Sequence, residues 1–291
     1  MISTRRWPSS VWGKMKMKFT KMQALGNDYI YINCLNQVVD NPSKWAVFLS
    51  NRHYGVGSDG LVLILPSEKA DFRMRMFNPD GTEAEICGNA LRSVGKYVYD
   101  YGLTKESSLS IETLAGIRTL ELTVKNGLVS MISADMGIPV LEPLKIPVDF
   151  PGDAYVEQPL KVDGRVFMAT AVSMGNPHVV AFIDDVDTFP LARYGPAMEH
   201  HKIFPKKVNA EFAQVIDRNT LKMRVWERST GETLACGTGC CVSVVGGVLT
   251  GRCERKAVVR QIGGELYIDW DAGSGHIFLT GPSERVFDGE I

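Results

Sequence analysis

Residues 84–92 read AEICGNALR, and residues 233–241 read TLACGTGCC. Each stretch contains a Cys-Gly pair, at Cys87 and Cys236, that opens a segment rich in apolar residues. The first segment ends at Gly102 and the second at Gly251, so each glycine stands equally far from its cysteine. A pattern that recurs at a fixed offset is typical of a repeated structural unit.

The same offset relates a second pair of motifs. Asn27 follows Leu-Gly, Asn176 follows Met-Gly, and each asparagine precedes the cysteine of its own half by the same interval. Because several spacings match at once, the sequence predicts two homologous lobes. A length of 291 residues is sufficient for two domains of ordinary size.

Proline marks the boundary between the lobes. Five of the 14 prolines fall between residues 136 and 160, where proline favours extended linker geometry because it lacks a backbone N–H. We therefore expect a linker within 136–158. The predicted organisation is a disordered extension (1–16), a first lobe (17–135), a second lobe (136–280) and a C-terminal segment (281–291) that returns to the first lobe.

Local patterns predict mostly strands, with one helix after each Cys-Gly pair. Polar and apolar residues alternate over 71–77 and 221–226, and glycine-containing turns predict hairpins at 125–128, 162–165 and 262–265. Gly246-Gly247 inside the second helix costs about 1 kcal/mol per glycine, which indicates that another backbone lies close. The expected fold is α+β: two pseudo-symmetric lobes, each a mostly antiparallel sheet or barrel wrapped around a central helix.

Composition excludes several classes of partner. The formal net charge is −1, so no overall field favours nucleic acid or an anionic membrane. The longest apolar runs are far shorter than the ~18 residues of a membrane span. Residues 1–16 are basic and lack the apolar core of a secretory signal, so we expect an extension outside the fold or an upstream start.

The six cysteines do not form a disulfide pattern. No Cys-x-x-Cys occurs, which weakens both a structural zinc and a thioredoxin-type interpretation. We expect a soluble cytoplasmic protein with reduced thiols. Cysteine is often simply buried, but only two of the six recur at matching places in the repeat. The other four are interpreted as structural: Cys34, Cys240, Cys241 and Cys253.

Cys87 and Cys236 are each predicted to stand at a helix N-terminus. Unpaired N–H groups and the positive end of the helix dipole favour an anion there, so we expect a lowered thiol pKa and a site for a substrate carboxylate. If the lobes face each other, two thiols meet one ligand. Such a pair suits removal of a proton from one face of a carbon and its return to the other.

With these motifs the chain resembles the diaminopimelate epimerase family from about Met17 to the C-terminus. The motifs that carry the resemblance are Leu25-Gly26-Asn27-Asp28, Phe77-Asn78 through Ile86-Cys87-Gly88-Asn89, Ser173-Met174-Gly175-Asn176-Pro177-His178, Val208-Asn209-Ala210, and Glu227-Arg228 through Ala235-Cys236-Gly237-Thr238-Gly239. Each motif is short, but their joint order and spacing are highly specific.

The resemblance implies a homodimeric isomerase that converts LL- to meso-2,6-diaminoheptanedioate in lysine and peptidoglycan precursor synthesis, without pyridoxal phosphate or metal. Cys87 and Cys236 would be the two catalytic bases, and His178 and Glu227 would tune the thiols. The residues that would bind the substrate are Asn27, Asn78, Gly88, Asn89, Asn176, Asn209, Glu227, Arg228, Gly237 and Thr238. Arginine and asparagine suit a zwitterionic amino-acid end.

Three positions depart from the family pattern. Gly60 stands where some members carry a substrate-contacting glutamine, so we assign no side-chain contact there. Ala90 replaces a common glycine and fits the first turn of a helix only if no positive φ is needed. Ser93 replaces a frequent cysteine and is interpreted as neutral packing.

The sequence alone leaves alternative functions open. A proline or hydroxyproline racemase would also pair two cysteines, or a cysteine and a threonine, but needs no site for a second amino-acid end. Phenazine-pathway isomerases of the same type dispense with the cysteine pair. A thiol-redox or metal-binding protein using Cys236, Cys240 and Cys241, or a pure binding module, is a more distant alternative.

Overall fold

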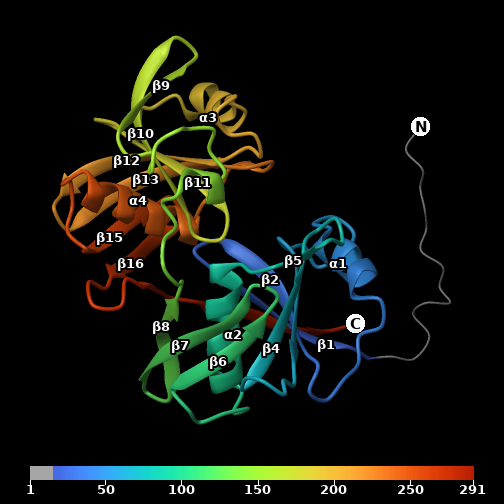
Figure 1. The fold of residues 1–291 in the computed structure, drawn as a ribbon. Coiled ribbons are helices and arrows are strands. Elements are labelled where there is room, and N and C mark those ends of the chain that lie inside the picture. Colours follow the sequence, from blue (N-terminus) through green and yellow to red (C-terminus); the bar gives the residue numbers. More distant parts are fainter. Residues whose placement is uncertain (1–15) are drawn as a thin grey trace, which may run out of the picture.

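The computed structural model describes residues 16–291, so the extension expected at 1–16 lies, apart from Lys16, outside the described residues. Two lobes are seen in Figure 1, one blue to green and the other yellow to orange. The elements of the first half are β1 (Lys18–Ala24), β2 (Asn27–Asn33), α1 (Pro42–Ser50), β3 (Leu61–Leu65), β4 (Phe72–Phe77), β5 (Glu83–Ala84), α2 (Gly88–Asp100), β6 (Ser108–Thr113), β7 (Gly116–Lys125) and β8 (Leu128–Asp135).

The second half repeats this order of elements. It comprises η2 (Pro143–Lys145), β9 (Gln158–Val162), β10 (Arg165–Ser173), β11 (Pro177–Phe182), α3 (Leu191–Glu199), β12 (Asn209–Asp217), β13 (Thr220–Glu227), β14 (Gly231–Glu232), α4 (Gly237–Leu249), β15 (Lys256–Gln261), β16 (Gly264–Trp270), β17 (Ile277–Gly281) and β18 (Glu284–Glu290). The interval between the first residues of α1 and α3 equals the interval between those of α2 and α4, and it is also the offset between the two cysteines.

Strand pairing repeats as well. The pairs β2–β3 and β4–β6 are parallel, and so are their counterparts β11–β12 and β13–β15. The other strand pairs of the described chain are antiparallel. The prediction of an α+β fold built from two related, mostly antiparallel lobes is therefore confirmed.

The two lobes share their sheet at two places. β17 pairs with β8, and β18 pairs with β1, so the red C-terminal strand lies beside the blue first strand in Figure 1. The connection between β8 and β9 spans residues 136–157 and holds the short η2 turn. These contacts hold the N-terminal ends of α2 and α4 in a common framework.

The hairpins follow the turn chemistry of the sequence. Asn126 and Gly127, and likewise Asp163 and Gly164, have positive φ between paired strands, as a two-residue turn of this kind requires. In the third hairpin Gln261 pairs with Gly264, so the turn lies one residue earlier than predicted. The strands predicted at 71–77 and 221–226 are β4 and β13.

Each central helix is enclosed by the strands of its own lobe. α2 contacts β1, β7 and β8, and α4 contacts β10, β11, β13 and β16. Leu91 and Val94 on α2 belong to the same buried cluster as Val244 and Val245 on α4, so the core continues from one lobe to the other. Within residues 16–291, no helix combines the length and the apolar character needed to cross a membrane.

The glycine pair of α4 lies against β11 and the loop that follows the helix. A Cβ at Gly246 would lie 2.5 Å from Cγ1 of Val180, and one at Gly247 would lie 2.5 Å from Sγ of Cys253. Side chains of a neighbouring strand and loop, rather than another backbone, therefore occupy the space that a larger residue would need. The small residues let α4 lie close to the strands of its own sheet, as predicted.

Candidate active site

Both cysteines of the repeat stand immediately before a helix. Cys87 has φ −134° and ψ 123°, and Cys236 has φ −128° and ψ 109°, so each is in the extended region while the next residue begins a helix. Neither helix has a side chain capping its first turn. No side chain therefore competes with a ligand for the N–H groups of these first turns.

The two helix N-termini meet. A Cβ at Gly237 would lie 3.9 Å from Oδ1 of Asn89, which places the first turn of α4 against the first turn of α2. The loop before β2 also contacts the second lobe, since a Cβ at Gly26 would lie 2.8 Å from Cδ1 of Leu234. The pseudo-twofold relation thus brings the two Cys-Gly motifs together.

Hydrogen-bond donors and amides surround Cys87. Its Sγ atom donates to Oδ1 of Asn27 at 3.5 Å, and Nδ2 of Asn89 donates to the same oxygen at 3.3 Å. The backbone N–H groups of Asn89 and Ala90 and the hydroxyl of Tyr29 also face the sulfur. The N–H groups and the Tyr29 hydroxyl can stabilise a thiolate by donation, whereas Oδ1 of Asn27 accepts from the protonated thiol.

Cys236 lies in a more acidic environment. Its Sγ atom is 3.5 Å from Oγ1 of Thr238, and its backbone N–H donates to Oε1 of Gln261 at 2.6 Å. Glu211 and Glu227 place two negative charges near the sulfur, and both raise the pKa of Cys236. This half of the site favours the protonated thiol.

Both thiols have a raised pKa, which contradicts the lowered values expected from their helix positions. Burial is the largest cause for each thiol. The N–H groups of the first turn act in the opposite direction but do not outweigh the loss of water. The pKa of Cys87 lies above its usual value, and that of Cys236 lies well above it.

A buried pair of ionisable side chains supports Cys236; His178 was predicted to tune the thiols, whereas its partner Glu211 was not foreseen. Nδ1 of His178 lies 2.7 Å from Oε1 of Glu211, and both side chains are fully buried. The ligand atoms of His178, Glu211 and Cys236 all lie within 4.8 Å of one another. The sequence feature that could have pointed to Glu211 is its position as a single acidic residue between apolar neighbours in a strand.

The asparagines of the second lobe orient His178. Oδ1 of Asn176 is 3.0 Å from Nε2 of His178, and Nδ2 of Asn209 is 3.4 Å from the same nitrogen. Oδ1 of Asn209 accepts a hydrogen bond from the backbone N–H of Arg228 at 2.8 Å. Asn176, His178 and Asn209 thus lie together with Cys236.

Glu227 acts on the thiols of both halves of the site. Its charge raises the pKa of both Cys87 and Cys236, and Thr233 donates a hydrogen bond to its carboxylate. Burial raises the pKa of Glu227 itself.

The side chains of two predicted binding residues make their hydrogen bonds outside this cluster. Nδ2 of Asn78 donates to Oγ1 of Thr82 at 3.0 Å, and the Arg228 side chain donates to the carbonyl of Lys206 at 3.3 Å. Asn78 directly follows the last residue of β4, and Arg228 directly follows the last residue of β13. Neither of these hydrogen bonds involves a thiol.

The three departures from the family pattern have local explanations. A Cβ at Gly60 would lie 2.3 Å from the carbonyl oxygen of Phe77, so a glutamine cannot occupy this backbone position. Ala90 is buried in the first turn of α2, where no positive φ is required. Ser93 is buried and its hydroxyl is 2.7 Å from that of Ser283.

Metal-ligating residue types gather at one place among residues 16–291: His178, Glu211 and Cys236. The expected alternative cluster is different, since Cys240 and Cys241 are fully buried in the core and are not part of this group. All six cysteines are free thiols.

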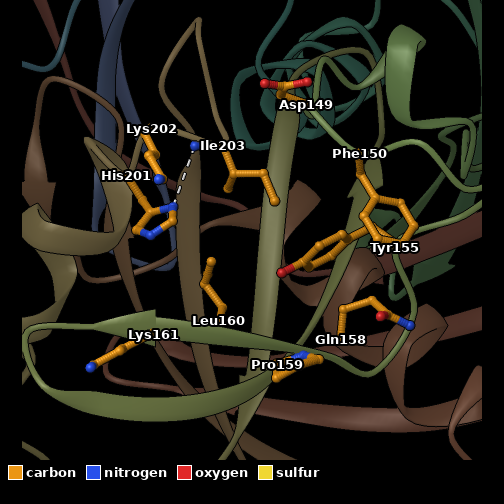
Figure 2. A pocket seen from close by; sticks show the side chains of 10 residues that line it. All are labelled: Asp149, Phe150, Tyr155, Gln158, Pro159, Leu160, Lys161, His201, Lys202 and Ile203. Atoms are coloured by element: carbon orange, nitrogen blue, oxygen red, sulfur yellow. Dashed lines mark hydrogen bonds between the residues drawn. The ribbon is translucent and has the colours of Figure 1, made fainter.

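A hollow of about 660 Å³ lies elsewhere in the second lobe. Figure 2 shows Phe150 and Tyr155 on one side of this hollow and His201 and Lys202 on the other. No residue of the two Cys-Gly motifs lines it. It is distinct from the region where the helix N-termini meet.

Comparison with known sequences agrees with the geometry. The profile of the family "Diaminopimelate epimerase" matches residues 19–141 and 170–286. Diaminopimelate epimerase of Acetivibrio thermocellus is 57% identical over 275 residues, which cover 94% of this chain and 98% of that protein. The enzyme of the same name from Methanococcus maripaludis is 53% identical and covers 94% of this chain and 99% of its own.

Solved structures share the fold at low sequence identity. A phenazine biosynthesis protein of the PhzF family from Bacillus anthracis has a TM-score of 0.69 at 20% identity, covering 96% of this chain and 99% of its own. A hydroxyproline epimerase from Agrobacterium vitis has a TM-score of 0.61 at 13% identity, covering 96% and 91%. At these identities the similarity extends to the fold alone.

Proposed function

The chain belongs to the diaminopimelate epimerase family and has that family's isomerase activity in lysine biosynthesis, and from this premise we propose that Cys87 and Cys236 are its two bases. The substrate is LL-2,6-diaminoheptanedioate and the product its meso isomer, which also serves peptidoglycan precursor synthesis. The proposed reaction uses no pyridoxal phosphate.

One observation carries it: two cysteines, each directly before a helix, stand at matching places in the repeat, and the two helix N-termini meet. A thiolate on one side removes the α-proton, and the electron pair left on carbon delocalises into the adjacent carboxylate. The thiol on the other side then donates its proton to the opposite face. The net change is inversion at one carbon, with one thiolate present before and after.

The substrate carboxylate at the reacting end binds the open N–H groups of Gly88, Asn89, Gly237 and Thr238. Backbone donors at a helix N-terminus stabilise this anion and the negative charge that develops on it during proton removal. The distal amino-acid end is bound by the remaining polar residues proposed for the site: Asn27, Asn78, Asn176, Asn209, Glu227 and Arg228.

The two thiols start from different states. Donors surround Cys87, whereas Glu211 and Glu227 raise the pKa of Cys236 after burial. In the free enzyme we therefore assign the proton to Cys236 and the thiolate to Cys87. Glu227 and His178 are the thiol-tuning residues of this assignment.

Incubation with LL-diaminopimelate in deuterated water tests the proposal. Metal-free and pyridoxal-free protein should yield the meso isomer with deuterium at the inverted α-carbon. Cys87→Ser and Cys236→Ser should each lower the rate by at least about 10²-fold, because proton transfer by a positioned group contributes that much or more. Cys241→Ser, in the same helix but facing the core, is the matched control and should retain the rate. Unchanged rates in either of the first two variants would contradict the assignment.

The homodimer, the cytoplasmic location and the lobe boundaries also belong to this proposal. β18 pairs with β1 along one edge, and its exposed Val286 and Phe287 provide an apolar surface beside an edge that has no partner strand within residues 16–291, as suits a second copy. Six free thiols suit a reducing cytoplasm. Sedimentation of the wild type and of Phe287→Asp tests the dimer: a monomeric wild type contradicts it.

A further inference from the structure

Arg92 is a buried charge without an acidic partner. The side chain is fully buried in α2, and no carboxylate within residues 16–291 forms an ion pair with it. Burial lowers the pKa of Arg92 to about 10. A buried, uncompensated guanidinium costs stability, so its position calls for a functional explanation.

The partners of this guanidinium are neutral groups of the active-site helix. Nη2 donates to Oδ1 of Asn89 at 2.7 Å, and Nη1 donates to the carbonyl of Gly88 at 3.3 Å. Nε has no hydrogen-bond partner among the described residues, and a Cβ at Gly281 would lie 3.3 Å from it. The charge therefore lies directly beneath the first turn of α2.

Arginine can only donate hydrogen bonds, and this fixes the direction of the amides beyond it. Because Oδ1 of Asn89 faces Arg92, its Nδ2 must point away, and it donates to Oδ1 of Asn27 at 3.3 Å. At the other end, Nδ2 of Asn27 donates to Oδ2 of Asp59 at 2.7 Å. A cation and a carboxylate thus determine which way both asparagine side chains face.

This order presents an oxygen to Cys87. Oδ1 of Asn27 accepts from Sγ of Cys87 at 3.5 Å, so the relay from Arg92 stabilises the protonated thiol that Cys87 becomes once it has taken the substrate proton. Oδ1 of Asn89 also lies 3.9 Å from the position of a Cβ at Gly237, which puts the guanidinium near the N-termini of both helices. A carboxylate bound there would supply the negative charge that Arg92 lacks.

We propose that Arg92 is a positioning residue, which holds the Asn89–Asn27 amides in the orientation that Cys87 needs and keeps its charge uncompensated for the substrate carboxylate. This inference rests on the proposed roles of Cys87 and of the helix N-termini.

Arg92→Met tests both parts, with Ser93→Ala as the matched control. Ser93 is buried in the same turn of α2, and its hydroxyl bonds the carbonyl of Asn89 and the hydroxyl of Ser283 without entering the relay. Arg92→Met should lower kcat/KM by about 10- to 100-fold, the range for loss of a hydrogen-bonded charge. Arg92→Lys, which keeps the charge without the fork, should recover part of this loss.

Alkylation of Cys87, followed by mass spectrometry over a pH range, separates this role from a purely structural one. Loss of a nearby positive charge disfavours the thiolate, so Arg92→Met should move the alkylation of Cys87 to higher pH, whereas Ser93→Ala should not. A folded Arg92→Met protein with unchanged kcat/KM and unchanged alkylation would overturn the inference.

Asn89→Asp keeps the inference testable if Arg92→Met does not fold. A carboxylate at this position would pair with the guanidinium, so Tm should rise by about 2–4 °C while kcat/KM falls, because the charge reserved for the substrate is then occupied. A lower Tm would contradict an uncompensated charge. If Cys87→Ser kept its epimerisation rate, the proposed function itself would fail. If Arg92→Met changed neither kcat/KM nor the alkylation of Cys87 while Cys87→Ser was inactive, only the role of Arg92 would fail and the assignment of the two bases would stand.

Discussion

Nδ1 of His178 lies 2.7 Å from Oε1 of Glu211, and neither side chain is exposed to solvent. Oε2 of Glu211 has no hydrogen-bond partner in the part of the chain that is described. The same carboxylate raises the pKa of Cys236. Glu211 therefore both orients the imidazole and holds a proton on the neighbouring thiol.

Glu211→Gln should make Cys236 easier to ionise. The substitution removes one negative charge within 4.8 Å of the sulfur and retains an oxygen that can accept from His178. We expect the alkylation of Cys236 to move to lower pH by about two to three units, as Coulomb's law gives at this distance and an effective dielectric constant near 20.

Cys87 is the internal control in this experiment. Of the two active-site sulfurs, Glu227 raises the pKa of both, whereas Glu211 is among the main causes of the raised pKa for Cys236 and not for Cys87. Site-resolved alkylation should therefore show a shift at Cys236 and little change at Cys87. An equal shift at both thiols would rule out a local effect of Glu211.

Asp28 should contribute to stability at neutral pH and lose that contribution in acid. It pairs with Lys21 and Arg52 at 2.8 Å each. Burial alone would raise the pKa of Asp28, but the hydrogen bonds from Arg52 and Lys21 outweigh it, so the pKa lies below its usual value. A carboxyl group with a depressed folded-state pKa stabilises the fold above its unfolded pKa, about 3.9, and ceases to do so as the pH falls through the folded value.

Asp28→Asn should accordingly lower the free energy of unfolding by about 2 kcal/mol at pH 7, since one partner, Arg52, is largely exposed. The difference from wild type should shrink below about pH 4. The control is Asp40→Asn. Asp40 is exposed and precedes α1, the helix that Arg52 follows, so this substitution should change stability little at either pH. Chemical denaturation at both pH values measures the effect, and a difference that grows in acid would refute it.

Local sequence patterns were sufficient for the features that depend on neighbours in the chain. The helices at Gly88 and Gly237 begin where the Cys-Gly motifs predict them, because a short polar turn followed by helically spaced apolar residues is a local signal. The hairpin turn at Asn126-Gly127 follows from the positive φ that these two residue types tolerate.

The remaining features depend on contacts between distant segments. Arg92 looks like an ordinary helical charge in the sequence, and it becomes fully buried because α2 packs against segments distant in the chain, Gly281 near the C-terminus among them. Glu211 becomes the partner of His178 through the parallel pairing of β11 and β12. The direction of the thiol pKa shift was missed for the same reason, since depth of burial is a property of the assembled lobes.

Gly246→Ala should destabilise the second lobe. The new Cβ would lie 2.5 Å from Cγ1 of Val180, so the helix or the strand must shift. Overpacking of this kind costs about 1–3 kcal/mol, which exceeds the gain of about 1 kcal/mol in helix propensity. Gly273→Ala is the control, because its Cβ would meet no atom closer than 3.4 Å. Thermal unfolding compares the two variants, and a Gly246→Ala protein at least as stable as wild type would disagree with the packing.

The order in which the two thiols ionise should govern the pH dependence of the reaction. Both thiols have a raised pKa, so kcat/KM, which reports the free enzyme, should still be rising above about pH 8.5, the usual value for a thiol. Cys87 should react with iodoacetamide at lower pH than Cys236, because donors surround the first sulfur and two carboxylates approach the second. Since the two sulfurs interact with the same Glu227, the measured pKa values belong to the pair. If Cys236 were alkylated first, the proton in the free enzyme would reside on Cys87, and the enzyme would begin each turnover from the opposite face of the substrate.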